Sequence, residues 1–210
     1  MIVIGLTGGI ASGKSTMAGI FRDLAIPVHD ADAAVHKMMA SGGEAVDTVR
    51  ACFGDQVLAS DGSIDRQRLG AEVFAEPSRR KELEAIIHPL VAMSRDRFLE
   101  THRQAGAPLA VLDIPLLFET GGEALCDFII LCSVDLDTQR QRALTRQGMT
   151  ADKFEAIVQS QMPLATKQTK ADAVIETNRG VEAARADLQA ILDGPVDELR
   201  RRQTRGGRDA

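Results

Sequence analysis

The chain has 210 residues, a formal net charge of −5, and neither tryptophan nor tyrosine. This length suits one α/β domain with inserted segments, or a domain and a half. Nucleic-acid binders usually show a basic face and often aromatic side chains on which bases stack, so the composition argues against that class. The apolar runs are far shorter than the ~20 residues of a membrane helix, and residues 1–7 lack the basic leading region of a secretory signal. We therefore expect a cytoplasmic protein without a membrane span.

The three cysteines are odd in number and scattered along the chain. Cys52, Cys126 and Cys132 each stand among apolar neighbours, which favours small buried side chains over a disulfide framework or a metal cluster.

The first part of the chain predicts a strand, a turn, a helix and a second strand. Residues 2–6 form a short apolar run rich in β-branched side chains, which is typical of a buried strand. After a glycine-rich turn, apolar residues recur at helical spacing and predict an amphipathic helix from about Lys14 to Leu24. Residues 26–29 then predict another short strand.

A long, mostly helical segment separates these elements from the next strands. Turn-forming residues interrupt the pattern between residues 41 and 103, and Asp65 and Ser78 are suited to cap helices there. Near-continuous apolar runs at residues 109–114 and 128–134 indicate central parallel strands.

The last third of the chain predicts two helical stretches between residues 137 and 161, separated by Gly148, with Thr150 capping the second. A short strand at residues 173–175 follows, and then a final helix that Gly194-Pro195 should close. The arginine-rich end beyond it is expected to fray into solvent.

Strands that alternate with helices imply a parallel sheet covered on both faces. We expect one domain over residues 1–194, followed by a charged, flexible tail at 195–210. Within the domain, the expected core is about 1–35, 108–136 and 171–194, the helical insertion about 36–107 and a lid about 137–170. The insertion is read either as a lobe that covers the substrate or as a plain structural insertion.

The strongest motif is a phosphate-binding loop between the first strand and the first helix. Residues 8–15 match G-x-x-x-x-G-K-[ST] at every defined position. Glycines let the backbone turn its N–H groups towards phosphate oxygens, and the helix presents its positive end. Lys14 should reach the β- and γ-phosphates, while Ser15 should bind Mg²⁺ beside Thr16 at the α-phosphate. The motif therefore predicts an ATP-dependent phosphotransferase. The alternative is a purely structural glycine-rich turn that binds no ligand. The residues expected to hold the nucleotide here are Gly8, Gly9, Ile10, Ala11, Ser12, Gly13, Lys14, Ser15 and Thr16.

Two carboxylates follow the second strand. In extended geometry Asp30 and Asp32 would point to the same side, towards the γ-phosphate at the carboxyl ends of the strands. One of them could accept the proton of the acceptor hydroxyl. The alternative is that they cap a helix beginning at Ala33. Asp113, at the end of another strand, is a candidate metal ligand, although hydrophobic strands often end in Asp.

Arg142 and Arg146 are four residues apart on an expected helix and share one face. They suit a lid that offsets negative charge on transferring phosphates. A solvated basic face is the other reading, and Lys167 and Lys170 carry the same ambiguity.

Several segments of the chain form a pattern that is more specific than the phosphate loop, which alone would fit many families. The segments are LTGGIASGKST (6–16), HDADAAVH (29–36), IIHPLV (86–91), LDIPLLFE (112–119) and the run from residue 139 to 177. With DAD, HP and PLLFE in this order and spacing, the chain resembles the dephospho-coenzyme A kinase family, and the resemblance extends to about residue 192.

The resemblance implies a P-loop NTPase three-layer fold with a central parallel sheet, a helical substrate-binding insertion and a helical lid. It also implies transfer of the ATP γ-phosphate to the ribose 3′-hydroxyl of dephospho-coenzyme A, the last step of coenzyme A synthesis. Mg²⁺ would be bound with the help of Ser15 and Asp113. The partner would be a small molecule, and the protein a monomer or a weak homo-oligomer.

The resemblance also assigns roles to residues. Asp32 would accept the proton, helped by Lys14, Arg142 and Arg146, and Arg142, Thr177 and Asn178 would contact the nucleotide. By itself, His88 reads as a helix-entry residue before Pro89. The residues implied for the acceptor are Asp30, Asp32, His88, Pro89, Pro115, Leu116, Leu117, Phe118 and Glu119.

Two rival functions remain at this point. Another small-molecule or nucleoside kinase would use the same loop with a different acceptor. An ATP-binding regulatory module would lack turnover, against which Asp32 and the paired arginines argue.

Overall fold

The structure, a computed structural model, describes residues 1–206 and divides the chain into two compact units. The first comprises residues 1–29 and 102–210, and the second residues 30–101. The second unit covers most of the segment expected as a helical insertion, but it begins at Asp30 and ends at Thr101.

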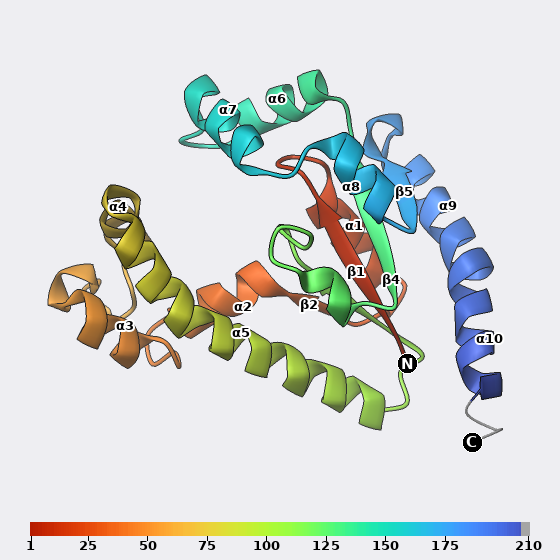
Figure 1. The fold of residues 1–210 in the computed structure, drawn as a ribbon, viewed down its shortest axis with the longest axis horizontal. Helices are drawn as coiled ribbons and strands as arrows, with labels where there is room; N and C mark the ends of the chain where they lie inside the picture. Colours follow the sequence, from red (N-terminus) through yellow and green to blue (C-terminus); the bar gives the residue numbers. More distant parts are fainter. Residues whose placement is uncertain (207–210) are drawn as a thin grey trace. The chain divides into compact units, whose positions relative to one another are not determined.

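The first unit contains a five-stranded sheet with the order β2-β3-β1-β4-β5 (Figure 1). The pairs β1–β3, β1–β4 and β4–β5 are parallel, which confirms the predicted parallel sheet. β1 lies at the centre and is buried throughout, as its apolar sequence predicts. The strands are β1 Ile2–Gly8, β2 Val28–Asp30, β3 Leu109–Asp113, β4 Phe128–Ser133 and β5 Ala173–Glu176.

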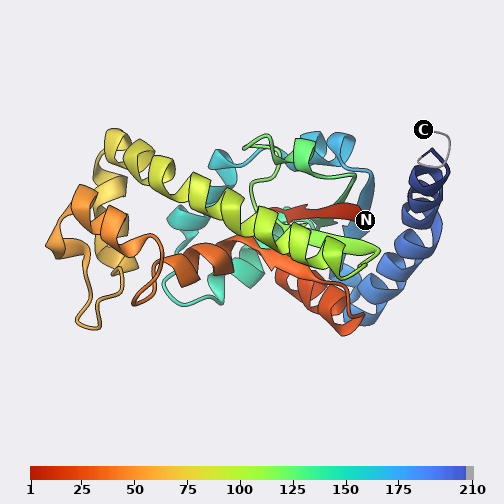
Figure 2. The same cartoon turned by 90° about the horizontal axis from the view of Figure 1, so that it is seen from below.

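Helices cover both faces of this sheet (Figure 2). On one face, side chains of α1 and α9 form a core with alternate residues of the strands, including Ile4, Ile130 and Ile175. On the other face, Ile129 packs with Leu117 and with residues next to α8. The helical segments of this unit are α1 Lys14–Asp23, η2 Gly122–Leu125, α6 Leu136–Leu144, α7 Ala151–Ser160, α8 Leu164–Lys170, η3 Thr177–Arg179, α9 Val181–Ile191, η4 Leu192–Val196 and α10 Asp197–Gly206.

The second unit is helical and has its own hydrophobic core, which includes Val49, Phe53 and Ile87. Asp65 accepts hydrogen bonds from two backbone N–H groups at the start of α4, as its predicted capping role requires. Its helical segments are α2 Ala31–Met38, α3 Val46–Phe53, η1 Asp55–Val57, α4 Arg66–Ala75 and α5 Pro77–Gln104, whose last residues belong to the first unit.

The predicted helix entry at His88-Pro89 is wrong, because Pro89 lies inside α5. A proline inside a helix removes one backbone hydrogen bond and costs about 3 kcal/mol. Apolar residues on both sides of it, such as Ile87 and Leu90, pack in the core of the second unit and offset that cost. Ser78 is also not a cap, because the helix begins at Pro77, where proline is favoured.

The predicted end of the last helix at Gly194-Pro195 is also wrong. The chain passes through the π-helical turn η4 and continues as α10 to Gly206, so a wider turn accommodates the proline. Val196 is buried and Leu199 packs against the same core, which holds this helix on the unit. The expected fraying tail is therefore helical over 197–206, and residues 207–210 lie outside the described part.

Several other sequence predictions are confirmed. Helices lie on both sides of Gly148, and Thr150 caps the second of them. The structure adds α8, which the sequence did not predict separately. Within residues 1–206, no helix has both the length and the apolar character that crossing a membrane requires.

Replacing Phe21 by alanine should test the core between α1 and the sheet. Phe21 is 0% exposed, so Phe21→Ala should lower the free energy of unfolding by about 3–5 kcal/mol. Phe74 is 93% exposed, and the same substitution there should change stability by less than about 0.5 kcal/mol. Urea unfolding of both variants measures the difference, and equal losses would contradict the assigned core.

Candidate nucleotide-binding site

The loop between β1 and α1 has the backbone that its motif predicts. β1 ends at Gly8 and α1 begins at Lys14. Gly13, immediately before α1, has φ of +88°, a conformation that favours glycine. Ala11 also has a positive φ, +56°, which is uncommon for a residue with a Cβ and typical of constrained functional loops.

Gly8 is needed because neighbouring segments of the protein leave no room for a side chain at this position, as well as for the turn. A Cβ on Gly8 would lie 2.9 Å from the carbonyl oxygen of Cys132 in β4 and still closer to Ser12 Oγ. A Cβ on Gly13 would lie 3.0 Å from the side chain of Thr177, just after β5. The loop is therefore pressed against the ends of two strands, which fixes its path.

Lys14 forms an ion pair with Asp113, at the end of β3. The Asp113 side chain is 2% exposed and that of Lys14 is 16% exposed, so the pair is largely shielded from water.

Burial first, and then the charge of Asp113, raises the pKa of Cys132 to about 12, so this thiol stays protonated at neutral pH. Within residues 1–206, none of the three cysteines forms a disulfide.

Ser15 and Asp113 supply a hydroxyl and a carboxylate near the start of α1, and oxygen donors are the ligands that Mg²⁺ prefers. Magnesium bound with nucleotides usually takes only one or two protein carboxylates, since phosphates and water complete its shell. In the described part of the chain, no three His, Cys, Asp or Glu side chains gather as a metal site. The donor set therefore fits a magnesium ion that a nucleotide brings with it.

The expectation that the two arginines share one helix face is wrong, because α6 ends at Leu144, before Arg146. Arg142 donates one hydrogen bond of 3.0 Å to Thr177 Oγ1 and another of 2.9 Å to the Thr177 carbonyl oxygen. The Thr177 hydroxyl in turn donates to the carbonyl oxygen of Ser12 at 2.8 Å. These bonds tie α6 and the end of β5 to the phosphate loop, whereas Arg146 is exposed.

Two glutamines that the sequence analysis did not select also border the loop. Gln161 Oε1 accepts a hydrogen bond from the Ile10 N–H at 3.2 Å. A Cβ on Gly9 would lie 2.7 Å from Nε2 of the buried Gln139. Both glutamines lie in the run 139–177 that contributes to the family resemblance, but the resemblance gave them no role, and only the tertiary structure brings α6 and the end of α7 to the loop.

Glu119 forms a 2.8 Å ion pair with the buried Lys167 and accepts a 2.8 Å hydrogen bond from the Met162 N–H. Burial raises the pKa of Glu119, but the hydrogen bonds from Lys167 and Met162 outweigh it and keep this pKa below its usual value. Lys167 is therefore not available to bind a phosphate, and it is not part of a solvated basic face either. Lys170, by contrast, pairs with Glu123 at the surface.

The segment before Glu119 is partly core. Leu117 and Phe118, which the resemblance assigns to the acceptor pocket, are 0% and 5% exposed and pack with Ile129. The Pro115 carbonyl oxygen accepts a hydrogen bond from the Thr7 hydroxyl, and Leu116 is 37% exposed. Leu116 is thus the apolar side chain of this segment that is most accessible to a ligand.

In the second unit, the expected extended geometry holds at Asp30 but is wrong at Asp32. Asp30 ends β2 and caps α2 by accepting the Ala33 N–H at 2.9 Å, which confirms the capping alternative for this residue. Asp32 is already helical, in the first turn of α2, and its side chain is exposed. His88 and Pro89 are exposed on α5.

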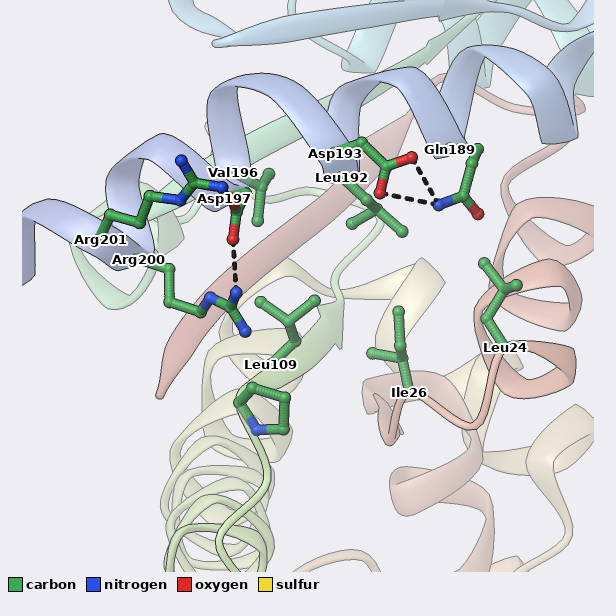
Figure 3. A pocket seen from close by; sticks show the side chains of 11 residues that line it. Leu24, Ile26, Leu109, Gln189, Leu192, Asp193, Val196, Asp197, Arg200 and Arg201 are labelled. Atoms are coloured by element: carbon green, nitrogen blue, oxygen red, sulfur yellow. Dashed lines mark hydrogen bonds and ion pairs between the residues drawn. The ribbon is translucent and has the colours of Figure 1, made fainter. Parts of the chain in front are cut away.

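A cavity of about 530 Å³ lies in the first unit, away from the loop (Figure 3). Leu109 lines it at the start of β3, so it lies at the amino end of this strand, whereas ligands of such sheets bind at the carboxyl ends. Its charged side chains already have partners, since Arg200 and Arg201 both pair with Asp197 and Asp193 accepts hydrogen bonds from the Gln189 amide. We therefore do not assign the cavity to the nucleotide.

Comparison with known proteins identifies relatives that agree with one another in their description. A family model described as dephospho-CoA kinase matches residues 2–183. A dephospho-CoA kinase from Mesorhizobium japonicum is 49% identical over 193 residues, which are 92% of this chain and 96% of the relative. Among solved structures, TT1252 from Thermus thermophilus is 34% identical with a TM-score of 0.79, over 92% of this chain and 97% of that one. A dephospho-CoA kinase from Campylobacter jejuni, 24% identical with a TM-score of 0.62 over 94% and 96% of the two chains, has the same fold.

Two glycine-to-alanine variants should separate the loop from ordinary helix effects. Gly8→Ala forces the loop away from Cys132, so it should weaken ATP binding by about 10² or more, the scale of a misplacement of roughly 1 Å. In α1, a Cβ on Gly19 meets nothing within 4 Å, so Gly19→Ala should keep binding and gain about 0.5–1 kcal/mol of stability. Titration calorimetry with ATP and thermal unfolding measure the two effects. Normal ATP binding by Gly8→Ala would contradict the loop geometry.

Proposed function

The chain belongs to the dephospho-CoA kinase family, and we propose that it transfers the γ-phosphoryl group of ATP to the ribose 3′-hydroxyl of dephospho-coenzyme A, giving coenzyme A and ADP. The observation that carries this proposal is the phosphate loop of residues 8–15, built between a central buried strand and a helix in a chain that matches the family over residues 2–183. The fold is that of the P-loop NTPases, and the enzyme is a phosphotransferase.

We propose that the triphosphate is held by backbone N–H groups of the loop and by the positive N-terminal end of α1. Lys14 would offset the charge of the β- and γ-phosphates. Its ion pair with Asp113 supports this role, because the buried carboxylate holds the ammonium group beside the loop. The Thr16 hydroxyl, exposed in the first turn of α1, would contact the α-phosphate.

We propose that Ser15 and Asp113 help to hold Mg²⁺ when the nucleotide is bound. The metal ion would supply positive charge that offsets the negative charge of the phosphates. Asp113 would then serve both Lys14 and the metal.

We assign the nucleotide side of the site to Arg142, Thr177 and Asn178, and charge stabilisation to Arg146. Support comes from the hydrogen bonds that join Arg142, Thr177 and the loop. Arg146 lies just beyond the end of α6 and is exposed, so its guanidinium is accessible to a phosphoryl group in transfer.

We propose that Asp32 accepts the proton of the acceptor hydroxyl. The Asp32 carboxylate is exposed, whereas the Asp30 carboxylate caps α2. Asp30 would therefore contribute to acceptor binding indirectly, by fixing the start of the helix that carries Asp32. Exposure also makes Leu116, His88 and Pro89 candidates for contact with the acceptor. We further propose a cytoplasmic enzyme, monomeric or weakly homo-oligomeric, whose partner is the small-molecule substrate.

The proposed reaction predicts a selective acceptor. ADP release should be fast with dephospho-coenzyme A and at least about tenfold slower with adenosine or nucleoside monophosphates, because these lack most of the binding groups of the acceptor. A coupled ADP assay over this panel makes the comparison. Preference for another acceptor would show a different kinase, and no turnover with any of them would favour an ATP-binding module.

Asp32→Asn should lower kcat by about 10²–10⁴, because it removes a general base and keeps the size of the side chain. ATP binding should remain close to normal. Asp47 offers a matched control, since it is also exposed and is also the second residue of a helix, α3. Steady-state kinetics at saturating ATP should give wild-type rates for Asp47→Asn, and similar rates for both variants would refute the role of Asp32.

A further inference from the structure

The phosphate loop has one backbone donor that is satisfied by a side chain from elsewhere in the first unit. The Ile10 N–H donates to Oε1 of Gln161, 151 residues further along the chain. Gln161 is the residue at which α7 ends, and its backbone is extended. Its amide oxygen therefore reaches the loop from a position that helix geometry alone does not fix.

A buried charged pair fixes that position instead. The next residue, Met162, donates its N–H to Glu119 Oε1 at 2.8 Å, and the same oxygen pairs with Lys167 at 2.8 Å. The Lys167 side chain is 2% exposed and that of Glu119 is 17% exposed, so water competes little for these bonds. A continuous set of contacts thus leads from Lys167 through Glu119 and Met162 to Gln161 and the loop.

The chemistry of the contact suits a loop that binds phosphates. A glutamine oxygen accepts a hydrogen bond without bringing a negative charge. A carboxylate at the same place would also accept the bond, but it would repel a triphosphate. The amide side chain of Gln139 on the same side, next to Gly9, is likewise neutral.

We propose that Gln161 is a positioning residue of the phosphate loop, and that Glu119 and Lys167 act through it by holding Met162. The inference rests on the proposed function, because it takes residues 8–15 as the triphosphate site. It gives Glu119 a role in the placement of the loop, in addition to the acceptor contact that the resemblance implies.

Gln161→Met tests the first part, because methionine has a similar length and lacks the amide acceptor. We expect kcat/KM for ATP to fall about tenfold, the value of one hydrogen bond to a backbone donor, while KM for dephospho-coenzyme A stays unchanged. The rise in Tm on adding ADP should shrink accordingly. Gln159→Met, at an exposed position of α7, is the control and should behave as wild type.

Gln161→Glu separates the acceptor from its charge. It keeps an oxygen for the Ile10 N–H, so kcat should stay within about threefold of wild type, while KM for ATP should rise through repulsion. Equal behaviour of Gln161→Met and Gln159→Met would overturn the proposal. So would a loss of kcat in Gln161→Glu of more than about threefold.

Two double variants test the action of Glu119 without leaving a buried charge unpaired. E119Q/K167M keeps an acceptor for the Met162 N–H and should lower kcat/KM for ATP less than E119L/K167M, which should reproduce the tenfold loss. Adding Gln161→Met to E119L/K167M should then cause little further loss, because both changes break the same set of contacts. Losses that multiply would show that Glu119 does not act through Gln161.

Lys14→Ala in the same assays separates this inference from the proposed function. If Lys14→Ala lowers kcat strongly and Gln161→Met does not, the loop assignment stands and the positioning role fails. If Lys14→Ala keeps wild-type kinetics, the phosphate-loop assignment itself fails.

Discussion

The close approach of the phosphate loop to the ends of β4 and β5 is the constraint on which the rest of the site depends. Gly8 and Gly13 allow this approach, because a Cβ at these positions would come too close to Cys132 and Thr177, respectively. The loop is then held from three directions, by Asp113 on Lys14, by Thr177 on Ser12 and by Gln161 on Ile10. A site prepared in this way loses little freedom when the nucleotide binds, which favours binding and catalysis alike.

Two largely buried ion pairs support this arrangement. Lys14 and Asp113 lie at the loop itself, while Lys167 and Glu119 lie behind the segment that carries Gln161. Buried ion pairs contribute little net stability compared with apolar side chains, but breaking one is costly. Their value here is therefore positional, because each holds a group in one place.

The two compact units divide the expected work of the enzyme. The first contains the sheet, the phosphate loop between a strand and a helix, and Arg142 on α6. The second has a separate hydrophobic core and carries Asp32 near its beginning. A core of its own lets the second unit keep its internal structure independently of the nucleotide, so the proposed base sits on a stable helix.

The sequence by itself determined the elements whose signal is local. Alternation of strands and helices, the glycines of the loop and the cap at Thr150 follow from hydrophobic period and turn chemistry, and all are observed.

Only the tertiary structure decided the rest. Packing of Ile87 and Leu90 keeps Pro89 inside a helix, and burial of Val196 carries the last helix past Pro195. Leu117 and Lys167 read as surface or ligand-binding residues until the fold buries them, and Gln161 reaches the loop across 151 positions. Such contacts join distant parts of the chain, so no local pattern of residues encodes them.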